Sequence, residues 1–129
     1  TIHTENPLPR VYGDAKRLHT VLHNLVENAI KFTPEGGWVR GRIFGQGAGV
    51  VIEVADNGVG IPKEAQGRIF DRFYRVHREG EVVSGTGLGL FIVREMVRLH
   101  DGRVEVESEP GQGSTFRVYV PAGAGAASE

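Results

Sequence analysis

The sequence predicts an α+β fold, a two-layer sandwich in which helices cover one face of a mixed sheet. Two long segments carry apolar side chains at helical spacing, and several shorter ones alternate apolar and polar residues or form apolar runs beside glycine-rich turns. The two kinds of segment are interleaved along a single chain of 129 residues, which is long enough for one domain with a substantial core.

The first elements are two short strands and a long helix. TIHTE and RVYG are predicted strands, and Asp14 is a good N-cap for a helix that runs to about Phe32. Thr33-Pro34 ends this helix because a residue before proline disfavours the helical conformation. Its apolar face is predicted to consist of Leu18, Val21, Leu22, Leu25, Ala29 and Phe32.

A hairpin, a short helix and a loop follow. WVRGRIFG and GVVIEVAD are predicted to pair across a glycine-rich turn. Pro62 suits the first turn of a short helix at about 62–69. Residues 71–84 carry many charges and no clear period, so we expect a loop there, with Phe70 and Phe73 pinning it by packing.

The last elements are a second long helix and a second hairpin. The helix is predicted from about Leu88 to Leu99, and HDG at 100–102 is a glycine C-cap signal. RVEVESE and STFRVYV alternate cleanly and are expected to pair around a Pro-Gly turn. The tail AGAGAASE is predicted to be flexible, which gives one domain at 1–121 and a tail at 122–129.

The composition excludes several kinds of site and partner. A formal net charge of −1 and a pI near 6.5 argue against binding to nucleic acid or to an anionic membrane surface. The absence of cysteine excludes disulfides and thiolate metal sites. The sequence shows no signal peptide and no membrane-spanning run, and it starts at Thr1 rather than methionine, as expected for a fragment of a longer protein.

Three polar residues form a stripe on the first predicted helix. Asn24, Asn28 and Lys31 are spaced i, i+4, i+7 and fall within about 60° of one another around the helix. Asparagine lowers helix propensity, so two asparagines are a poor choice for a merely solvated face. A carboxamide oxygen can ligate Mg²⁺, and a lysine can meet a phosphate. From this helix alone, a solvated face and a ligand site both remain open.

A carboxylate continues the apolar row of a predicted strand. Asp56 shares one face with the apolar side chains at 50, 52 and 54 by the period of two. An ionised carboxylate on a core face is costly unless hydrogen-bond donors reach it, and the exocyclic amino group of a base would be such a donor. Asp-Asn-Gly is also a strong turn signal, although no second strand begins directly after it. Gly58 and Gly60 would let the backbone pass close to a flat ligand.

The stretch VVSGTGLGLFIV, residues 82–93, has the glycine content of a phosphate loop. Gly85, Gly87 and Gly89 occur at every second position before an apolar run. Leu90 stands where the dinucleotide fingerprint needs its third glycine, and the Gly-Lys-Ser/Thr of the Walker loop is missing. By itself this loop is compatible with phosphate binding and with a plain turn into a helix.

Taken together, these segments resemble the catalytic, ATP-binding domain of bacterial sensor histidine kinases, in the superfamily that includes gyrase and heat-shock chaperones. HNLVENAIKFT is similar to that family's N box, DNGVGIP to its first glycine box, IFDRFYRV to its phenylalanine box and GTGLGL to its second glycine box. GQGSTFRVYVP resembles its closing strand motif. The resemblance implies a Bergerat-type ATP-binding fold, with about five strands in a mixed sheet covered by three helices.

The resemblance assigns a base pocket. Asp56 would accept a hydrogen bond from the adenine amino group, with a water assisting. Gly58, Gly60 and Ile61 would line the pocket, and Ser114, from the closing strand, would join them.

The resemblance also assigns phosphate and metal ligands. Asn28 would hold Mg²⁺, with Asn24 and Lys31 near the phosphates. Tyr74 and Arg75 begin the lid over the nucleotide, Arg75 would reach the terminal phosphates, and Lys31 and Arg75 are the expected catalytic residues. Backbone N–H groups of the second glycine box would bind phosphate at a helix N-terminus, from Gly85, Thr86, Gly87, Leu88 and Gly89.

Phosphotransfer is favoured over hydrolysis. Related ATPases and serine kinases place a glutamate base one helical turn before the Mg²⁺-binding asparagine, whereas this chain has Asn24, and a carboxamide cannot take a proton from water. Glu27 lies about 60° around the helix from Asn24 and is badly placed for that role. The expected activity is that of a protein-histidine kinase. The alternatives are an ATP-hydrolysing or serine-kinase member of the superfamily and a non-catalytic nucleotide-binding module.

The resemblance implies partners outside this sequence. The family's phosphorylated histidine lies in a helical hairpin, in a pattern similar to His-Glu-Leu-Arg-Thr-Pro, and none of the five histidines here has that context. We therefore expect the chain to bind ATP and Mg²⁺ without phosphorylating itself. It is expected to act on a phosphoacceptor hairpin domain of the same parent protein, which passes the group to a response regulator. The isolated domain is expected to be monomeric and cytoplasmic, with a membrane-anchored parent, and to contact neither nucleic acid nor membrane directly.

Overall fold

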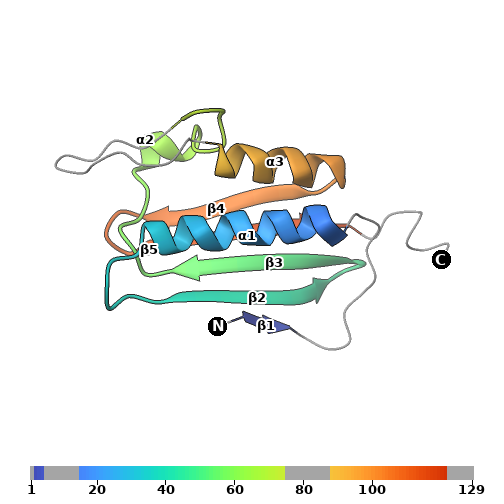
Figure 1. Ribbon diagram of the computed structural model, residues 1–129, viewed down its shortest axis with the longest axis horizontal. Helices are drawn as coiled ribbons and strands as arrows, with labels where there is room; N and C mark the ends of the chain where they lie inside the picture. The colour runs from blue at the N-terminus through green and yellow to red at the C-terminus, as the bar shows by residue number, and fades with distance from the viewer. Residues whose placement is uncertain (1, 5–14, 75–87, 122–129) are drawn as a thin grey trace.

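The computed structural model describes residues 2–4, 15–74 and 88–121, which form five strands and three helices (Figure 1). The predicted N-cap Asp14, the predicted strand RVYG and the tail at 122–129 lie outside these ranges. The strands are β1 (Ile2–Thr4), β2 (Val39–Gln46), β3 (Gly49–Asp56), β4 (Arg103–Glu109) and β5 (Gly113–Val120). The helices are α1 (Ala15–Lys31), α2 (Lys63–Gln66) and α3 (Gly89–Leu99).

The strands form one mixed sheet in the order β1-β2-β3-β5-β4. β1 runs parallel to β2, and the other neighbours are antiparallel. The two predicted hairpins are the pairs β2–β3 and β4–β5, while β3 and β5, which are distant in sequence, pair in the centre with Ile52 opposite Val118. The predicted α+β class, with about five strands in a mixed sheet and three helices, is confirmed.

Both long helices pack on one face of the sheet. The ribbon shows α1 and α3 over the same face of the sheet (Figure 1). Their apolar stripes pack against alternate side chains of β3 and β5. Burying each such side chain is worth roughly 1.5–3 kcal/mol, so this layer holds the fold together. The largest fully buried members are Val21, Leu25, Val54, Val93, Val97, Phe116, Val118 and Val120.

Helix ends depart from the sequence expectation. α2 covers 63–66 rather than 62–69, because the chain continues in turns from Gly67 onward. At the end of α3 the left-handed conformation falls on Asp101, with a φ of 57°, and not on the glycine that follows. Gly102 is required for a different reason, since a Cβ there would lie 2.1 Å from the carbonyl oxygen of Tyr119.

The ends of several elements meet at one end of the molecule, on the left in Figure 1. α1, β3 and β4 finish there, α2 lies beside them, and α3 begins there. The N box, the first glycine box, residues 88–90 of the second glycine box and the start of the closing strand motif belong to these segments. The fold therefore gathers the described parts of the chemistry-bearing motifs at a single end.

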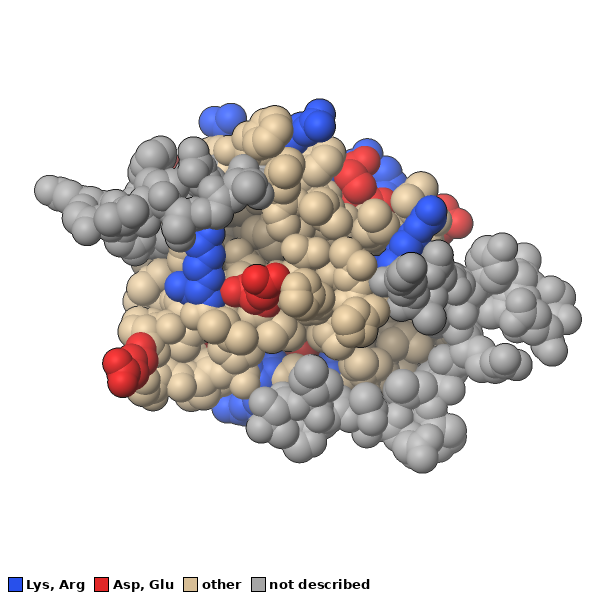
Figure 2. Space-filling model, in the orientation of Figure 1, with Lys and Arg blue, Asp and Glu red and all other residues tan. Residues whose placement is uncertain are grey.

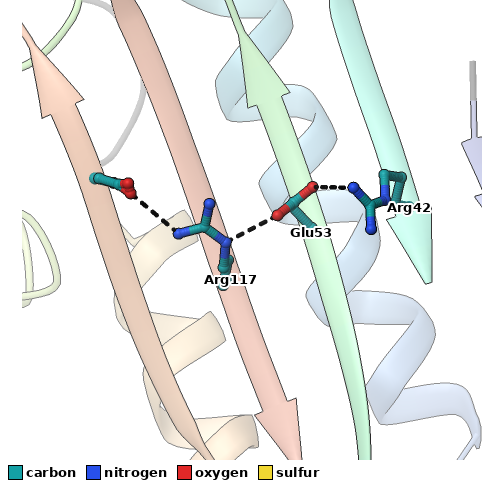
Figure 3. Close-up of polar contacts among 4 residues, drawn as sticks. Arg42, Glu53 and Arg117 are labelled. Atoms are coloured by element: carbon teal, nitrogen blue, oxygen red, sulfur yellow. Dashed lines mark hydrogen bonds and ion pairs between the residues drawn. The ribbon is translucent and has the colours of Figure 1, made fainter. Parts of the chain in front are cut away.

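The face of the sheet that the helices leave uncovered carries a row of ion pairs across four strands (Figure 3). Arg42 on β2 lies 3.7 Å from Glu53 on β3, and Arg117 on β5 donates to Glu53 at 2.8 Å and to Glu107 on β4 at 3.3 Å. The hydrogen bond to Glu53 is the main cause that raises the pKa of Arg117 above its usual value. This outer face is therefore polar, in contrast to the apolar face beneath the helices.

Charged side chains of both signs are scattered over the side viewed in Figure 2, and the described residues form no broad patch of one sign there. This distribution agrees with the small net charge of the sequence. No helix in the described part of the chain is both long enough and apolar enough to span a membrane.

Candidate functional site

Asp56 ends β3 on the core face, as the alternation predicts, and it is 7% exposed. Its Oδ1 accepts a hydrogen bond from the Gly58 N–H at 2.8 Å, and Ser114, its partner on β5, donates a second backbone N–H. Burial raises the pKa of Asp56 above its usual 3.8, and the two N–H groups lower it only in part. A ligand that brings a further donor would therefore stabilise the ionised carboxylate.

Gly58 and Gly60, in the loop after Asp56, are required by the packing of the chain itself. A Cβ at Gly58 would lie 2.2 Å from the carbonyl oxygen of Phe32, and one at Gly60 would lie 2.2 Å from that of Glu109. Gly60 also has a φ of 74°, which favours glycine. The loop is thus held between the end of α1 and the β4–β5 turn. Close approach to the chain is a sufficient reason for both glycines, and their clearance for a ligand stays a prediction.

Ile61 is fixed by a hydrogen-bond network that the sequence reasoning missed. Its N–H donates to Ser108 Oγ at 2.8 Å, and that hydroxyl is 2.9 Å from both Ser114 Oγ and the Gly113 carbonyl oxygen. Gln66 Nε2 donates to the carbonyl oxygens of Ile61 at 2.9 Å and Ser108 at 3.1 Å. The predicted β4–β5 hairpin held one usable signal, because it places Ser108 opposite Ser114. Nothing in the sequence pointed to Gln66.

Asn28 and Lys31 lie in the last turn of α1, beside this loop. The carbonyl oxygen of Phe32, just after the helix, accepts a hydrogen bond from the Val59 N–H at 3.1 Å. The Asn28 carboxamide is half-buried and forms no hydrogen bond with another described residue. Lys31 is exposed, with its ammonium 5.4 Å from the centre of the Phe32 ring. The N box and the first glycine box therefore adjoin.

Asn24 connects the N box to the start of α3. Its Nδ2 donates to the Thr20 carbonyl oxygen at 2.9 Å, and a Cβ on Gly89 would lie 3.3 Å from its Oδ1. Leu88 is the N-cap residue of α3, and its carbonyl oxygen accepts the Ile92 N–H at 2.8 Å. The last residues of the second glycine box thus begin a helix next to the asparagine stripe.

The phenylalanine box splits into packed and exposed residues. Phe70 packs edge to face on Phe116, with ring centres 6.1 Å apart, and Tyr74 packs against the core with Arg68 over its ring at 4.9 Å. Phe73 is 60% exposed, so the expectation that it packs is wrong. The physical reason is its backbone, since a left-handed φ of 65° turns the chain and leaves the ring outside the core.

Four predicted phosphate-binding residues lie outside the described ranges: Arg75, Gly85, Thr86 and Gly87. The others fit a nucleotide with magnesium: a buried carboxylate for a base, a carboxamide oxygen, a lysine, and a helix N-terminus that favours anions. The described residues contain no group of three or more histidine, aspartate or glutamate side chains that could hold a metal. A Mg²⁺ ion at Asn28 would therefore take most of its oxygen ligands from a bound phosphate and from water.

A protein-family model described as "Histidine kinase-, DNA gyrase B-, and HSP90-like ATPase" matches residues 13–124. This chain belongs to that family. The match includes the N box, both glycine boxes and the closing strand, and the described parts of these segments meet at one end of the fold.

Named relatives of this ATPase domain are sensor kinases. The chain is 44% identical over 114 residues to the alginate biosynthesis sensor protein KinB of Pseudomonas aeruginosa, and 45% identical over 114 residues to the sensor-like histidine kinase SenX3 of Mycobacterium tuberculosis. Each match covers 88% of this chain, but only 19% of KinB and 28% of SenX3. The chain thus spans a minor part of these relatives.

Solved histidine kinases share the fold. The mycobacterial sensor histidine kinase MprB matches with a TM-score of 0.77 and 29% identity, over 93% of this chain and 83% of that one. Full-length ShkA, solved in complex with AMPPNP, matches with a TM-score of 0.80 and 36% identity, over 94% of this chain and 25% of that one. The domain is therefore of the histidine kinase catalytic type.

Proposed function

We propose that this domain binds ATP with Mg²⁺ and donates the γ-phosphoryl group to a histidine on a separate phosphoacceptor domain of its parent protein. The observation that carries the proposal is the buried Asp56 carboxylate, whose loop contacts the end of α1 just after Asn28 and Lys31. The naming of relatives as sensor histidine kinases and the AMPPNP complex of ShkA support it.

Asp56 recognises the base in this proposal. Its carboxylate accepts a hydrogen bond from the adenine amino group, which offsets the cost of burial that raises its pKa. Gly58, Gly60 and Ile61 line the pocket, and Ser114 lies on the strand opposite.

The phosphates lie along the end of α1 and the start of α3. Asn28 ligates Mg²⁺ through its carboxamide oxygen, and Asn24, Lys31 and Arg75 lie near the phosphates. Backbone N–H groups at 85–89 bind phosphate oxygens where α3 begins. Bound Mg²⁺ supplies charge neutralisation on the transferred group, so the residues of this domain position the nucleotide and balance its charge.

Transfer to a partner is favoured over hydrolysis because the position of a water-activating base holds Asn24, whose amide donates to its own helix. The nearby carboxylate, Glu27, is held 2.6 Å from His23 Nε2 on the exposed side of α1. The acceptor then lies in a helical-hairpin domain that passes the group to a response regulator, within a parent that is membrane-anchored with this domain in the cytoplasm.

The test mixes the domain with γ-labelled ATP, Mg²⁺ and the phosphoacceptor hairpin of its parent protein. We expect acid-labile label on the hairpin histidine, none on this domain alone, and none anywhere with Asp56→Ala. Nucleotide binding without any transfer would make the domain a regulatory module. Steady phosphate release by the domain alone would make it an ATPase.

A further inference from the structure

The network around Ser108 has a fixed number of protons, and that number decides which way its hydroxyls point. A serine hydroxyl donates once and accepts twice. The Ile61 N–H can only donate to Ser108 Oγ, and the Gly113 carbonyl oxygen can only accept from it. Ser108 then has one lone pair left, and Ser114 Oγ lies 2.9 Å from it. All four groups are satisfied only when the Ser114 hydroxyl donates to Ser108.

That arrangement changes what Ser114 offers to a ligand. Once its proton points to Ser108, the Ser114 hydroxyl presents only acceptor lone pairs elsewhere. Ser114 is the cross-strand partner of Asp56, and both lie on the core face with less than a tenth of their surface exposed. The Asp56 carboxylate is also an acceptor when ionised. The two side chains together therefore present acceptors and no donor.

We propose that Ser108 is a positioning residue for the base pocket, which holds the Ile61 backbone and directs the Ser114 proton so that the pocket selects a purine carrying an exocyclic amino group. The proposal rests on the proposed nucleotide-binding function and deepens it. A carbonyl in place of the amino group, as in hypoxanthine, brings a lone pair against these acceptors and is rejected.

Gln66 supports the same pocket through the backbone. Its amide donates to the Ile61 and Ser108 carbonyl oxygens, so both backbone groups of Ile61 are tied to the β4–β5 hairpin, one through a serine hydroxyl and one through a glutamine. The Ile61 side chain is buried in the core. The loop that carries the base-binding groups is therefore formed before any nucleotide arrives, which lowers the entropic cost of binding.

The test compares ATP with ITP, inosine triphosphate, by calorimetric titration of the wild type, Ser108→Ala and Ser108→Thr. We expect Ser108→Ala to reduce the preference for ATP over ITP about tenfold, the worth of one well-placed hydrogen bond. Ser108→Thr keeps the hydroxyl and restores the preference. Thr115→Ala, which removes a hydroxyl from the outer face of the same β5 strand, is the matched control and leaves the preference unchanged.

A second measurement tests, without any nucleotide, whether Ser108 holds the Ile61 backbone. Without any ligand, the Ile61 amide hydrogen exchanges faster in Ser108→Ala than in the wild type, and in Thr115→Ala it does not. Unchanged Ile61 exchange together with an unchanged ATP-to-ITP ratio in Ser108→Ala overturns the role of Ser108. Absence of all nucleotide binding by the wild type, with faster Ile61 exchange in the variant, overturns the proposed function and the selectivity with it. If Ser108→Ala fails to fold, Ser114→Ala answers the selectivity question, because it removes the hydroxyl whose lone pairs are proposed to disfavour ITP.

Discussion

At the scale of single residues, Asp56 is unusual because a carboxylate occupies a buried position of a strand. An apolar residue buried at this position would stabilise the fold. The carboxylate is instead buried with a raised pKa and two backbone donors. Natural sequences accept such a local cost mainly at functional sites. Replacing Asp56 with a neutral residue should therefore raise the stability of the fold and lower its affinity for the ligand.

Replacing Asp56 with alanine is expected to lower ATP affinity about ten- to a hundredfold, because a hydrogen bond to a charged group contributes about 1.5–3 kcal/mol. Isothermal titration with a non-hydrolysable ATP analogue measures the loss. Glu53→Gln, which neutralises a carboxylate on the opposite face of the same strand, is the control and should bind normally. Undiminished affinity in Asp56→Ala would refute the assignment of the base pocket.

The raised pKa of Asp56 predicts how unfolding depends on pH. A carboxyl whose pKa is higher in the folded than in the unfolded chain binds more protons when folded, between the two values. Between pH 3.8 and the raised value, its contribution to the unfolding free energy therefore falls as pH rises. Compared with Asp56→Asn, the nucleotide-free wild type should lose stability over that window in urea titrations. A wild type that gains stability relative to the variant there would contradict the direction of the pKa shift.

The elements differ in how far the sequence could specify them. Local sequence patterns predicted α1, α3 and all five strands, β1 as TIHTE included, within a residue or two, because such patterns show directly in the order of residues. The central β3–β5 pairing joins segments far apart in the chain and has no local signal. The hydrogen bonds around Ile61 were missed for the same reason, since Ser108 lies far along the chain. The exposure of Phe73 was missed because nothing in the sequence indicates its left-handed φ of 65°.

Gly60→Ala should destabilise the fold by at least about 3 kcal/mol, because its Cβ would meet the Glu109 carbonyl at 2.2 Å in addition to the strain of a positive φ. Gly47 is the matched control, since its φ is 59° and a Cβ added there would have nothing within 4 Å. Gly47→Ala should cost only about 1–2 kcal/mol, the strain alone. Equal losses in urea denaturation would show that the loop does not press on the β4–β5 turn.

The row of ion pairs on the outer face of the sheet stabilises pairing between strands and not the site. Glu53→Gln should reduce the free energy of unfolding by about 1 kcal/mol. The loss should shrink in 1 M salt, because the Debye screening length is then only about 3 Å. Thermal melting at two salt concentrations measures this. A loss that does not depend on salt would assign the role of Glu53 to packing instead.

At the scale of the whole molecule, the sheet and helices bring the described parts of four separated motifs to one end. The face of the sheet away from the helices is polar. Nothing in this arrangement requires the phosphoacceptor to lie in the same domain. Two of the described histidines have local partners, since His23 pairs with Glu27 and His100, just after α3, contacts the Met96 carbonyl oxygen.

The domain alone should therefore bind nucleotide and carry no phosphohistidine after incubation with labelled ATP and Mg²⁺. Asn28→Ala should remove the Mg²⁺ dependence of binding while leaving affinity for the metal-free nucleotide. Acid-labile label on the isolated domain would contradict the separation of donor and acceptor.

The most direct measurement is an amide NMR titration of the domain with AMPPNP and Mg²⁺. Saturable binding should shift the resonances of residues 56–61 and 114 and those of the last turn of α1, and Asp56→Ala should abolish the shifts while keeping the folded spectrum. Saturation that leaves residues 56–61 unmoved, or shifts that persist undiminished in Asp56→Ala, would contradict the assignment of the base pocket to Asp56.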